Sequence, residues 1–191
     1  MGRRVVIIAG IPGCSCKAVV DTLRGWGYAS TWPGQDCDVY LGNNCRLRGE
    51  NLAVRELHDS ILYEKRTNWF TDRSPKYYNI PHPGPDGVLD KFPEHQDVVL
   101  ADPMFCFFLP MWHGRYTDLI VCNWQEDVAI VSVEKWSGKG REDCLGVIRH
   151  YRERLESHTA REPVASLSHE EARSGDCVRL EKEFKNQFLD R

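Results

Sequence analysis

Hydrophobic positions near the start of the chain form the pattern of a buried strand followed by an amphipathic helix. Residues 5–8 are four consecutive β-branched residues, which is typical of a strand buried on both faces of a parallel sheet. From residue 18 to residue 26 the apolar positions recur at the spacing of one helix face. The pattern therefore predicts a β-strand, a turn and an α-helix in direct succession.

The turn between this strand and helix is rich in glycine and small residues. It contains two glycines and a proline, which break the strand and let the backbone turn sharply. A strand, a glycine-containing turn and a helix direct free backbone N–H groups toward an anion. We therefore predict a phosphate-binding loop formed by Gly10, Pro12, Gly13, Cys14, Ser15, Cys16 and Lys17.

This loop differs from a full Walker A motif. Gly13 lies closer to Gly10 than the second glycine of that motif lies to the first. Ala18 follows Lys17 at the position where Ser or Thr would hold magnesium. The pattern alone leaves two interpretations open, an anion-binding loop and a strand–turn–helix unit without a ligand.

Apolar runs and helical spacings along the rest of the chain predict further strands and helices. Strands are expected over residues 97–101, 118–122 and 163–167. Helices are expected from Glu50 onward and over residues 127–136, 143–158 and 178–189. Strands that alternate with helices predict a three-layer α/β/α domain with a parallel sheet, of the P-loop nucleotide-binding type, spanning residues 1–191.

The spacing of apolar residues assigns positions within three of these segments. The helix over 127–136 carries Val128, Val131 and Trp136 on related faces. The helix over 143–158 is expected to bury Leu145, Ile148, Tyr151 and Leu155. The apolar segment 105–109, which ends at Pro110, is expected to be core or a short helix.

Two segments lack periodicity, residues 30–49 and residues 71–95. The second contains many prolines and glycines, and its length is typical of a functional lid or a mobile segment. We therefore expect this segment to form the substrate side of any active site.

Composition and charge exclude several classes of protein. The net charge is −3, which gives no general reason to expect nucleic-acid or membrane binding. No apolar run approaches the roughly 20 residues that span a bilayer, and no secretory signal is evident at the start. We expect a cytoplasmic protein.

The eight cysteines are scattered, without the paired spacing of a structural zinc site, so no metal is expected. Reduced thiols are expected, and Cys106 and Cys122 lie in apolar runs where cysteine acts as a small hydrophobe. Cys14 and Cys16 carry a separate hypothesis, because a thiol at a helix N-terminus has a lowered pKa and can be redox-sensitive.

Several of these segments, in this order, resemble the sulfotransferase family of P-loop folds. Residues 10–16 resemble the family's Gly-x-Pro-Arg-Ser-Gly-Thr loop, which holds the 5′-phosphosulfate of the donor. Residues 102–106 and 109–112 resemble its Lys-Asp-Pro-Arg-x-Cys and Leu-Pro-x-Trp segments, the most specific match. Asp127-Val128-Ala129 and Ser132 resemble the 3′-phosphate segment. The resemblance covers nearly the whole chain.

The resemblance implies transfer of a sulfuryl group from 3′-phosphoadenosine 5′-phosphosulfate to a hydroxyl or amine of a small-molecule or glycan acceptor. It implies that Asn123 and Ser132 lie at the donor's 3′-phosphate and that Glu50 acts as the base. Lys17 would supply positive charge to the leaving phosphate. His58 is an alternative base, and Asp102 is placed either to meet a ligand or to cap the next turn. His113 is expected to be structural.

Two further functions stay open. Gly13 and Cys16 replace a cation and a hydroxyl of the family loop, and Asn123 stands where an arginine clamps the 3′-phosphate. These replacements favour a nucleotide- or anion-binding protein of the same fold without the chemistry. A small-molecule kinase using ATP is the third function, although no Ser or Thr follows Lys17 to hold magnesium.

Overall fold

The computed structural model describes residues 2–10, 16–30, 51–64, 84–160 and 164–182. Within these residues the strands form a four-stranded, all-parallel sheet in the order β2-β1-β3-β4. The elements are β1 (Val5–Ala9), α1 (Cys16–Gly25), α4 (Leu52–Glu64), α5 (Gly84–Leu89), β2 (Val98–Ala101), α6 (Phe105–Trp112), β3 (Asp118–Cys122), α7 (Glu126–Ser137), α8 (Arg141–Thr159), β4 (Ala165–Leu167) and α9 (His169–Ser174).

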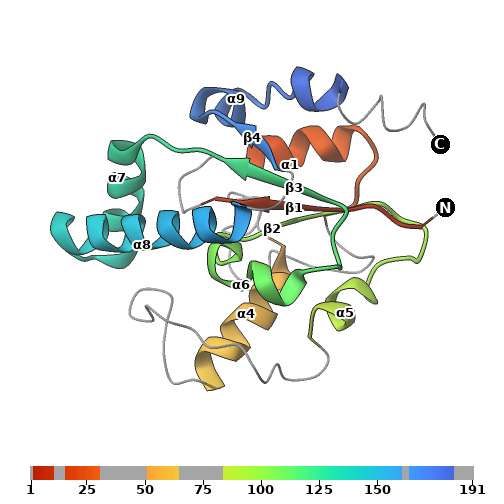
Figure 1. Ribbon diagram of the computed structural model, residues 1–191, viewed down its shortest axis with the longest axis horizontal. Helices are drawn as coiled ribbons and strands as arrows, with labels where there is room; N and C mark the ends of the chain where they lie inside the picture. The colour runs from red at the N-terminus through yellow and green to blue at the C-terminus, as the bar shows by residue number, and fades with distance from the viewer. Residues whose placement is uncertain (1, 11–15, 31–50, 65–83, 161–163, 183–191) are drawn as a thin grey trace.

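Helices cover both faces of the sheet and make the fold three-layered. α1 and α9 lie on one face, and α4, α5, α6 and α8 lie on the other (Figure 1). Ala29 extends the sheet beyond β2 through a parallel bridge to Val98. The fold is thus the three-layer α/β/α arrangement with a parallel sheet that the alternation of strands and helices predicts.

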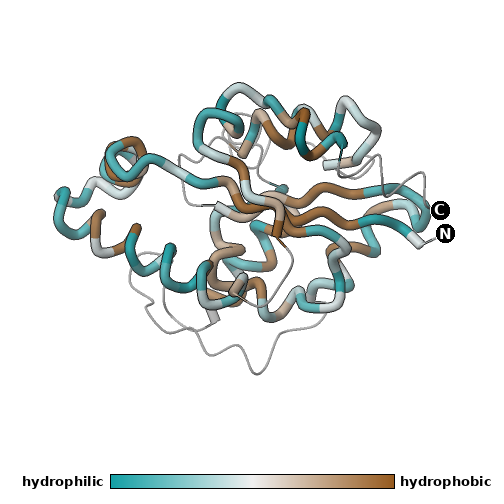
Figure 2. Tube along the Cα trace, turned by 45° about the horizontal axis from the view of Figure 1, so that its top comes forward, coloured by the Kyte–Doolittle hydropathy of each residue, from teal (hydrophilic) through white to brown (hydrophobic). Residues whose placement is uncertain are grey.

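The strand residues alternate between two hydrophobic cores. Val5 and Ile7 of β1 face the core beneath α4, α6 and α8, whereas Val6 and Ile8 face the core beneath α1 and α9. All five residues of β1 are buried, and the strands form the hydrophobic centre of the molecule in Figure 2. An unbroken β-branched run follows directly from burial on both faces.

Arg4 joins the amino ends of the strands. Its guanidinium forms an ion pair with Asp118 at 2.9 Å, and its backbone N–H donates to Asp97 at 2.7 Å. The Arg4 side chain is almost fully buried. The charged groups at the amino edge of the sheet thus pair with one another. In such sheets a ligand is expected at the opposite, carboxyl edge.

Most predicted elements are present close to their predicted bounds. The strands over 97–101, 118–122 and 163–167 correspond to β2, β3 and β4, and the helices over 127–136 and 143–158 correspond to α7 and α8. Residues 178–182 are helical, in agreement with the start of the predicted closing helix. The segment 31–50 and the first part of 71–95, through residue 83, lie outside the described residues.

Three sequence predictions are wrong in detail. The prediction that residues 71–95 lack regular structure missed α5, whose Val88 and Leu89 are buried. Pro110 does not end the apolar segment, because it lies inside α6. The prediction for 163–189 also missed α9, which has a capping box between Ser168 and Glu171.

The buried face of α7 does not include Val128 and Val131. Val128 is 37% exposed and Val131 is 58% exposed, whereas Ala129, Ile130 and Val133 are buried. The apolar residues of this helix occupy neighbouring faces, so that spacing alone does not choose between them. In α8 the predicted stripe is largely correct, since Ile148, Tyr151 and Leu155 are buried and Leu145 is half-buried.

Four cysteines of the described residues are free and buried: Cys106, Cys122, Cys144 and Cys177. Cys16 is disulfide-bonded, so the expectation of reduced thiols is wrong at this position. Burial raises the pKa of Cys122 to about 12, and burial also raises the pKa of Cys106 and Cys177. These thiols therefore stay protonated at neutral pH.

We expect Cys106 and Cys122 to resist alkylation in the folded protein. At pH 8 iodoacetamide should leave both unmodified, because a buried thiol with a raised pKa has little thiolate. In urea both should react within minutes. Peptide mass spectrometry after a timed exposure checks this, and rapid labelling of either residue in the folded protein would contradict it.

Candidate functional site

Polar residues follow three neighbouring strands at the carboxyl edge of the sheet. Gly10 follows β1, Asp102 follows β2 and Asn123 follows β3. β1 leads into α1 on one face, whereas β2 and β3 lead into α6 and α7–α8 on the other side of the molecule (Figure 1). α/β proteins bind ligands at the carboxyl ends of strands whose connections diverge in this way.

Helix α1 begins at this edge with Cys16 and Lys17. Its first turn contains no acidic residue, whereas the first turns of α7, α8 and α9 each contain two. The Lys17 ammonium forms a partly exposed ion pair with Asp21, one turn along the helix. The N-terminus of α1 therefore combines the positive end of the helix dipole with one lysine and no acidic side chain in its first turn, a combination that suits an anion.

Several predicted site residues lie outside the described residues, namely Pro12, Gly13, Cys14, Ser15 and Glu50. Gly10 is buried at the end of β1. Asn51, which follows Glu50 in the sequence, is described. The predictions for the five outside residues stay predictions.

Asn51 attaches the start of α4 to the carboxyl edge. Its side-chain oxygen accepts from the Val54 N–H at 3.2 Å, as an N-cap does, and its Nδ2 donates to the Ser30 carbonyl at 2.6 Å. Its backbone N–H donates to the Ala101 carbonyl at 2.9 Å. The three hydrogen bonds hold the first turn of α4 beside the end of β2.

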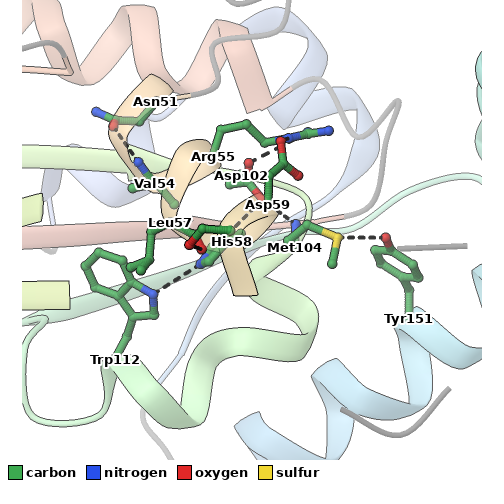
Figure 3. Close-up of polar contacts among 11 residues, drawn as sticks. Asn51, Val54, Arg55, Leu57, His58, Asp59, Asp102, Met104, Trp112 and Tyr151 are labelled. Atoms are coloured by element: carbon green, nitrogen blue, oxygen red, sulfur yellow. Dashed lines mark hydrogen bonds and ion pairs between the residues drawn. The ribbon is translucent and has the colours of Figure 1, made fainter. Parts of the chain in front are cut away.

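Asp102 is the centre of a buried polar chain that reaches from β2 to α6 (Figure 3). Its Oδ1 accepts from the Met104 N–H at 2.7 Å and lies 3.1 Å from His58 Nδ1. The other ring nitrogen, His58 Nε2, lies 3.3 Å from Trp112 Nε1. The side chains of Asp102 and His58 are fully buried.

These contacts decide the protonation of His58. The indole N–H of Trp112 can only donate, so Nε2 accepts and the proton of the neutral ring lies on Nδ1, facing Asp102. The ring also stacks on Phe108, with centroids 4.3 Å apart. Both nitrogens of His58 are thus engaged inside the core. The geometry does not support the alternative prediction that His58 is the base, and it makes His58 the residue that orients Asp102.

Asp102 caps a turn from a fully buried position at the end of β2. The bond to the Met104 N–H confirms the prediction that Asp102 caps the turn before α6. Its second oxygen, Oδ2, is buried without a hydrogen bond and lies 3.9 Å from the Arg55 guanidinium. Its charge also raises the pKa of Cys106, after the larger effect of burial, while the Gly10 backbone lowers that pKa through hydrogen bonding. Gly10, Asp102 and Cys106 therefore lie together between the ends of β1 and β2.

Asn123 and Ser132 were both predicted at the donor's 3′-phosphate. Asn123 Nδ2 donates to Ser166 Oγ at 2.6 Å, and its backbone N–H donates to the Leu167 carbonyl at 2.8 Å. These bonds connect the end of β3 to β4. Ser132 is half-buried in the middle of α7. The structure places Asn123 at the carboxyl edge and shows no hydrogen bond between Asn123 and Ser132.

Sequence reasoning missed three members of this site, namely Arg55, Trp112 in its role toward His58, and Asn51. Trp112 was singled out as part of a motif, but its hydrogen bond depends on α4 and α6 packing against each other. The spacing of Asn51 and Val54 is an N-cap signal that was available in the sequence. His113, predicted to be structural, is the exposed residue that ends α6.

The part of the chain that the structure describes holds neither a cluster of metal-ligating side chains nor a helix that could span a membrane. No group of three or more His, Cys, Asp or Glu side chains there is arranged to hold a metal ion. None of the helices there is both long and apolar enough to cross a membrane.

Comparisons with known proteins give similarity to solved structures. No family model and no curated protein matches this chain. Among solved structures, the chain is similar to the crystal structure of TT1252 from Thermus thermophilus, with 18% sequence identity and a TM-score of 0.47. The match covers 95% of this chain and 98% of that chain.

Proposed function

We propose that this protein binds an anionic nucleotide at the junction of β1 and α1. The observation that carries the proposal is the start of α1, which lies at the carboxyl edge of the sheet with no acidic residue in its first turn and with Lys17 in it. Helix N-termini at this edge bind phosphate and sulfate groups through backbone N–H groups. Residues 11–15 connect β1 to this helix and supply the predicted loop.

The reaction we propose is sulfuryl transfer from 3′-phosphoadenosine 5′-phosphosulfate to a hydroxyl or amine of a small-molecule or glycan acceptor. It is supported by the sequence resemblance, and the three-layer parallel fold is compatible with it. Such a transfer needs a base for the acceptor's proton and positive charge at the leaving phosphate. Glu50 and Lys17 are the residues proposed for these two roles.

A second function is favoured by how the polar groups are paired. Lys17 pairs with Asp21, and Asn123 donates to Ser166. A ligand that used Lys17 would have to displace its carboxylate partner. These pairings favour a protein that binds a nucleotide or another anion and does not catalyse transfer.

Calorimetric titration with adenosine 3′,5′-bisphosphate tests the binding step. We expect micromolar binding to the intact protein and a loss of about tenfold in Lys17→Ala, because a charge-assisted contact contributes about 1.5–3 kcal/mol and part of it is offset by the loss of the Asp21 pair. ATP with magnesium serves as the comparison ligand. Binding of ATP alone would instead support a kinase.

Arg24→Ala is the matched control for Lys17→Ala. Arg24 lies at the opposite end of α1 and also pairs with Asp21, at 3.6 Å. Its removal should leave the affinity unchanged. An equal loss of affinity in both variants would show that the loss comes from a general change in the surface charge of α1. This result would overturn the proposed anion site. Transfer of labelled sulfate from the donor to a panel of phenols, amines and sugars then separates the two functions, since the binding protein would show none.

A further inference from the structure

A cavity lies beside the carboxyl end of β3, between β4 and the second half of α8. It has a volume of about 520 Å³, within the roughly 300–1,000 Å³ of small-molecule sites. It is lined by Asn123 and Trp124 after β3, by Arg152 and Leu155 of α8, and by Ser166 of β4. α8 and α1 cover opposite faces of the sheet (Figure 1), so this cavity differs from the β1–α1 junction.

The cavity offers a flat aromatic surface with hydrogen-bonding groups around it. The Arg152 guanidinium lies over the Trp124 ring, 5.5 Å from its centroid. Val121, Leu155 and Val164 supply apolar surface. A planar ligand stacks well against an indole and a guanidinium plane.

Two polar groups here have unused hydrogen-bonding capacity. Asn123 uses its Nδ2 toward Ser166, and its side-chain oxygen accepts no hydrogen bond within the described residues. The Ser166 hydroxyl accepts from Asn123, which leaves its own proton to donate. The cavity therefore presents a donor and an acceptor.

The charges at the cavity are balanced. Arg152 forms an ion pair with Glu126 at 3.6 Å, and Glu156 also lines the cavity. A phosphate group here would meet one cation that already faces carboxylates. The electrostatics thus favour an uncharged ligand over an anionic one.

We propose that this cavity binds an uncharged planar nitrogen heterocycle of nucleobase size. Its ring lies against Trp124 and Arg152, its edge pairs with the Asn123 amide, and a ring nitrogen or carbonyl accepts from the Ser166 hydroxyl. An amide side chain can accept from an exocyclic amine and donate to a ring nitrogen. The proposal does not depend on the anion site, because it requires no phosphate and no contact with Lys17.

Titration of the intact protein with adenosine and uridine, followed by NMR of the tryptophan indole groups, tests this proposal. The Trp124 signal is assigned from its loss in Trp124→Phe. We expect this signal to shift on ligand addition, and we expect Arg152→Met and Asn123→Leu to weaken binding by about 5- to 100-fold, the range of a single base–aromatic or base-edge contact. Both residues are at least partly exposed, so these variants should fold.

Arg149→Met is the matched control, because Arg149 is an exposed arginine one turn earlier on α8 and does not line the cavity. It should bind both nucleosides like the unmodified protein. Absence of nucleoside binding at millimolar concentration, or equal binding in Asn123→Leu and the unmodified protein, would overturn the proposal.

An anionic ligand is the alternative occupant of the cavity. Adenosine 3′-monophosphate that binds ten times more tightly than adenosine, with this difference lost in Arg152→Met, would identify an anion site instead. Failure of bisphosphate binding with retained nucleoside binding would overturn only the anion site.

Discussion

Replacement of Asp102 by alanine should lower the free energy of unfolding by about 2–4 kcal/mol. The substitution removes the acceptor of two buried donors, the Met104 N–H and the His58 Nδ1–H. A buried donor left without a partner costs about 1–3 kcal/mol. The His58 ring, held from the other side by Trp112, cannot turn to another partner without losing that bond. Urea unfolding followed by circular dichroism measures the change.

Asp102→Asn is the control that separates the acceptor from the charge. The asparagine oxygen can still accept from both donors, whereas the attraction between Oδ2 and the Arg55 guanidinium, 3.9 Å away, is lost. We expect this variant to lose about 1 kcal/mol or less. If asparagine destabilises the protein as much as alanine, the charge of Asp102 is what matters and the hydrogen-bonded chain through His58 is not the main contribution.

Replacement of Ile130 by alanine should also destabilise the protein strongly, by about 2–4 kcal/mol. Ile130 is 3% exposed and belongs to the core beneath α7 and α8. Truncation of a buried isoleucine removes its contacts and leaves a cavity, which together cost about 2–5 kcal/mol. The same urea unfolding experiment measures this loss.

Val131→Ala is the neighbouring comparison for Ile130→Ala. Val131 is 58% exposed, so its truncation should change the free energy of unfolding by less than about 0.5 kcal/mol. Alanine is also the better helix former. Similar losses in both variants, or a larger loss at Val131, would contradict the face of α7 that the structure shows.

The local patterns of the chain were enough to predict most elements because their signals are local. The β-branched run 5–8 has no polar position, and this requires a strand covered on both faces. The apolar stripe of α8 was likewise readable, since Ile148, Tyr151 and Leu155 repeat at helical spacing. α7 was less well predicted, because Val128 and Val131 on one face compete with Ile130 and Val133 on another.

The candidate site was only partly predictable. The sequence placed Gly10, Asp102 and Asn123 after strands, and parallel pairing brings such positions to one edge. It did not indicate that the two nitrogens of His58 would be used inside the core by Asp102 and Trp112. Those partners are 44 and 54 residues away, and no spacing rule connects residues at that separation.

The sequence by itself determined the class of fold, the order of most of the described strands and helices, and the strand–turn–helix pattern at its start. It did so because an element that is buried on one or two faces has apolar residues at a regular spacing along its sequence. Only the tertiary structure decided which polar groups contact one another. It showed that Asn123 joins β3 to β4 and lines a cavity with Trp124 and Arg152. It also showed that His58 orients Asp102. Such contacts depend on how elements distant in sequence pack together, and side-chain hydrogen bonds between them leave no periodic pattern along the chain.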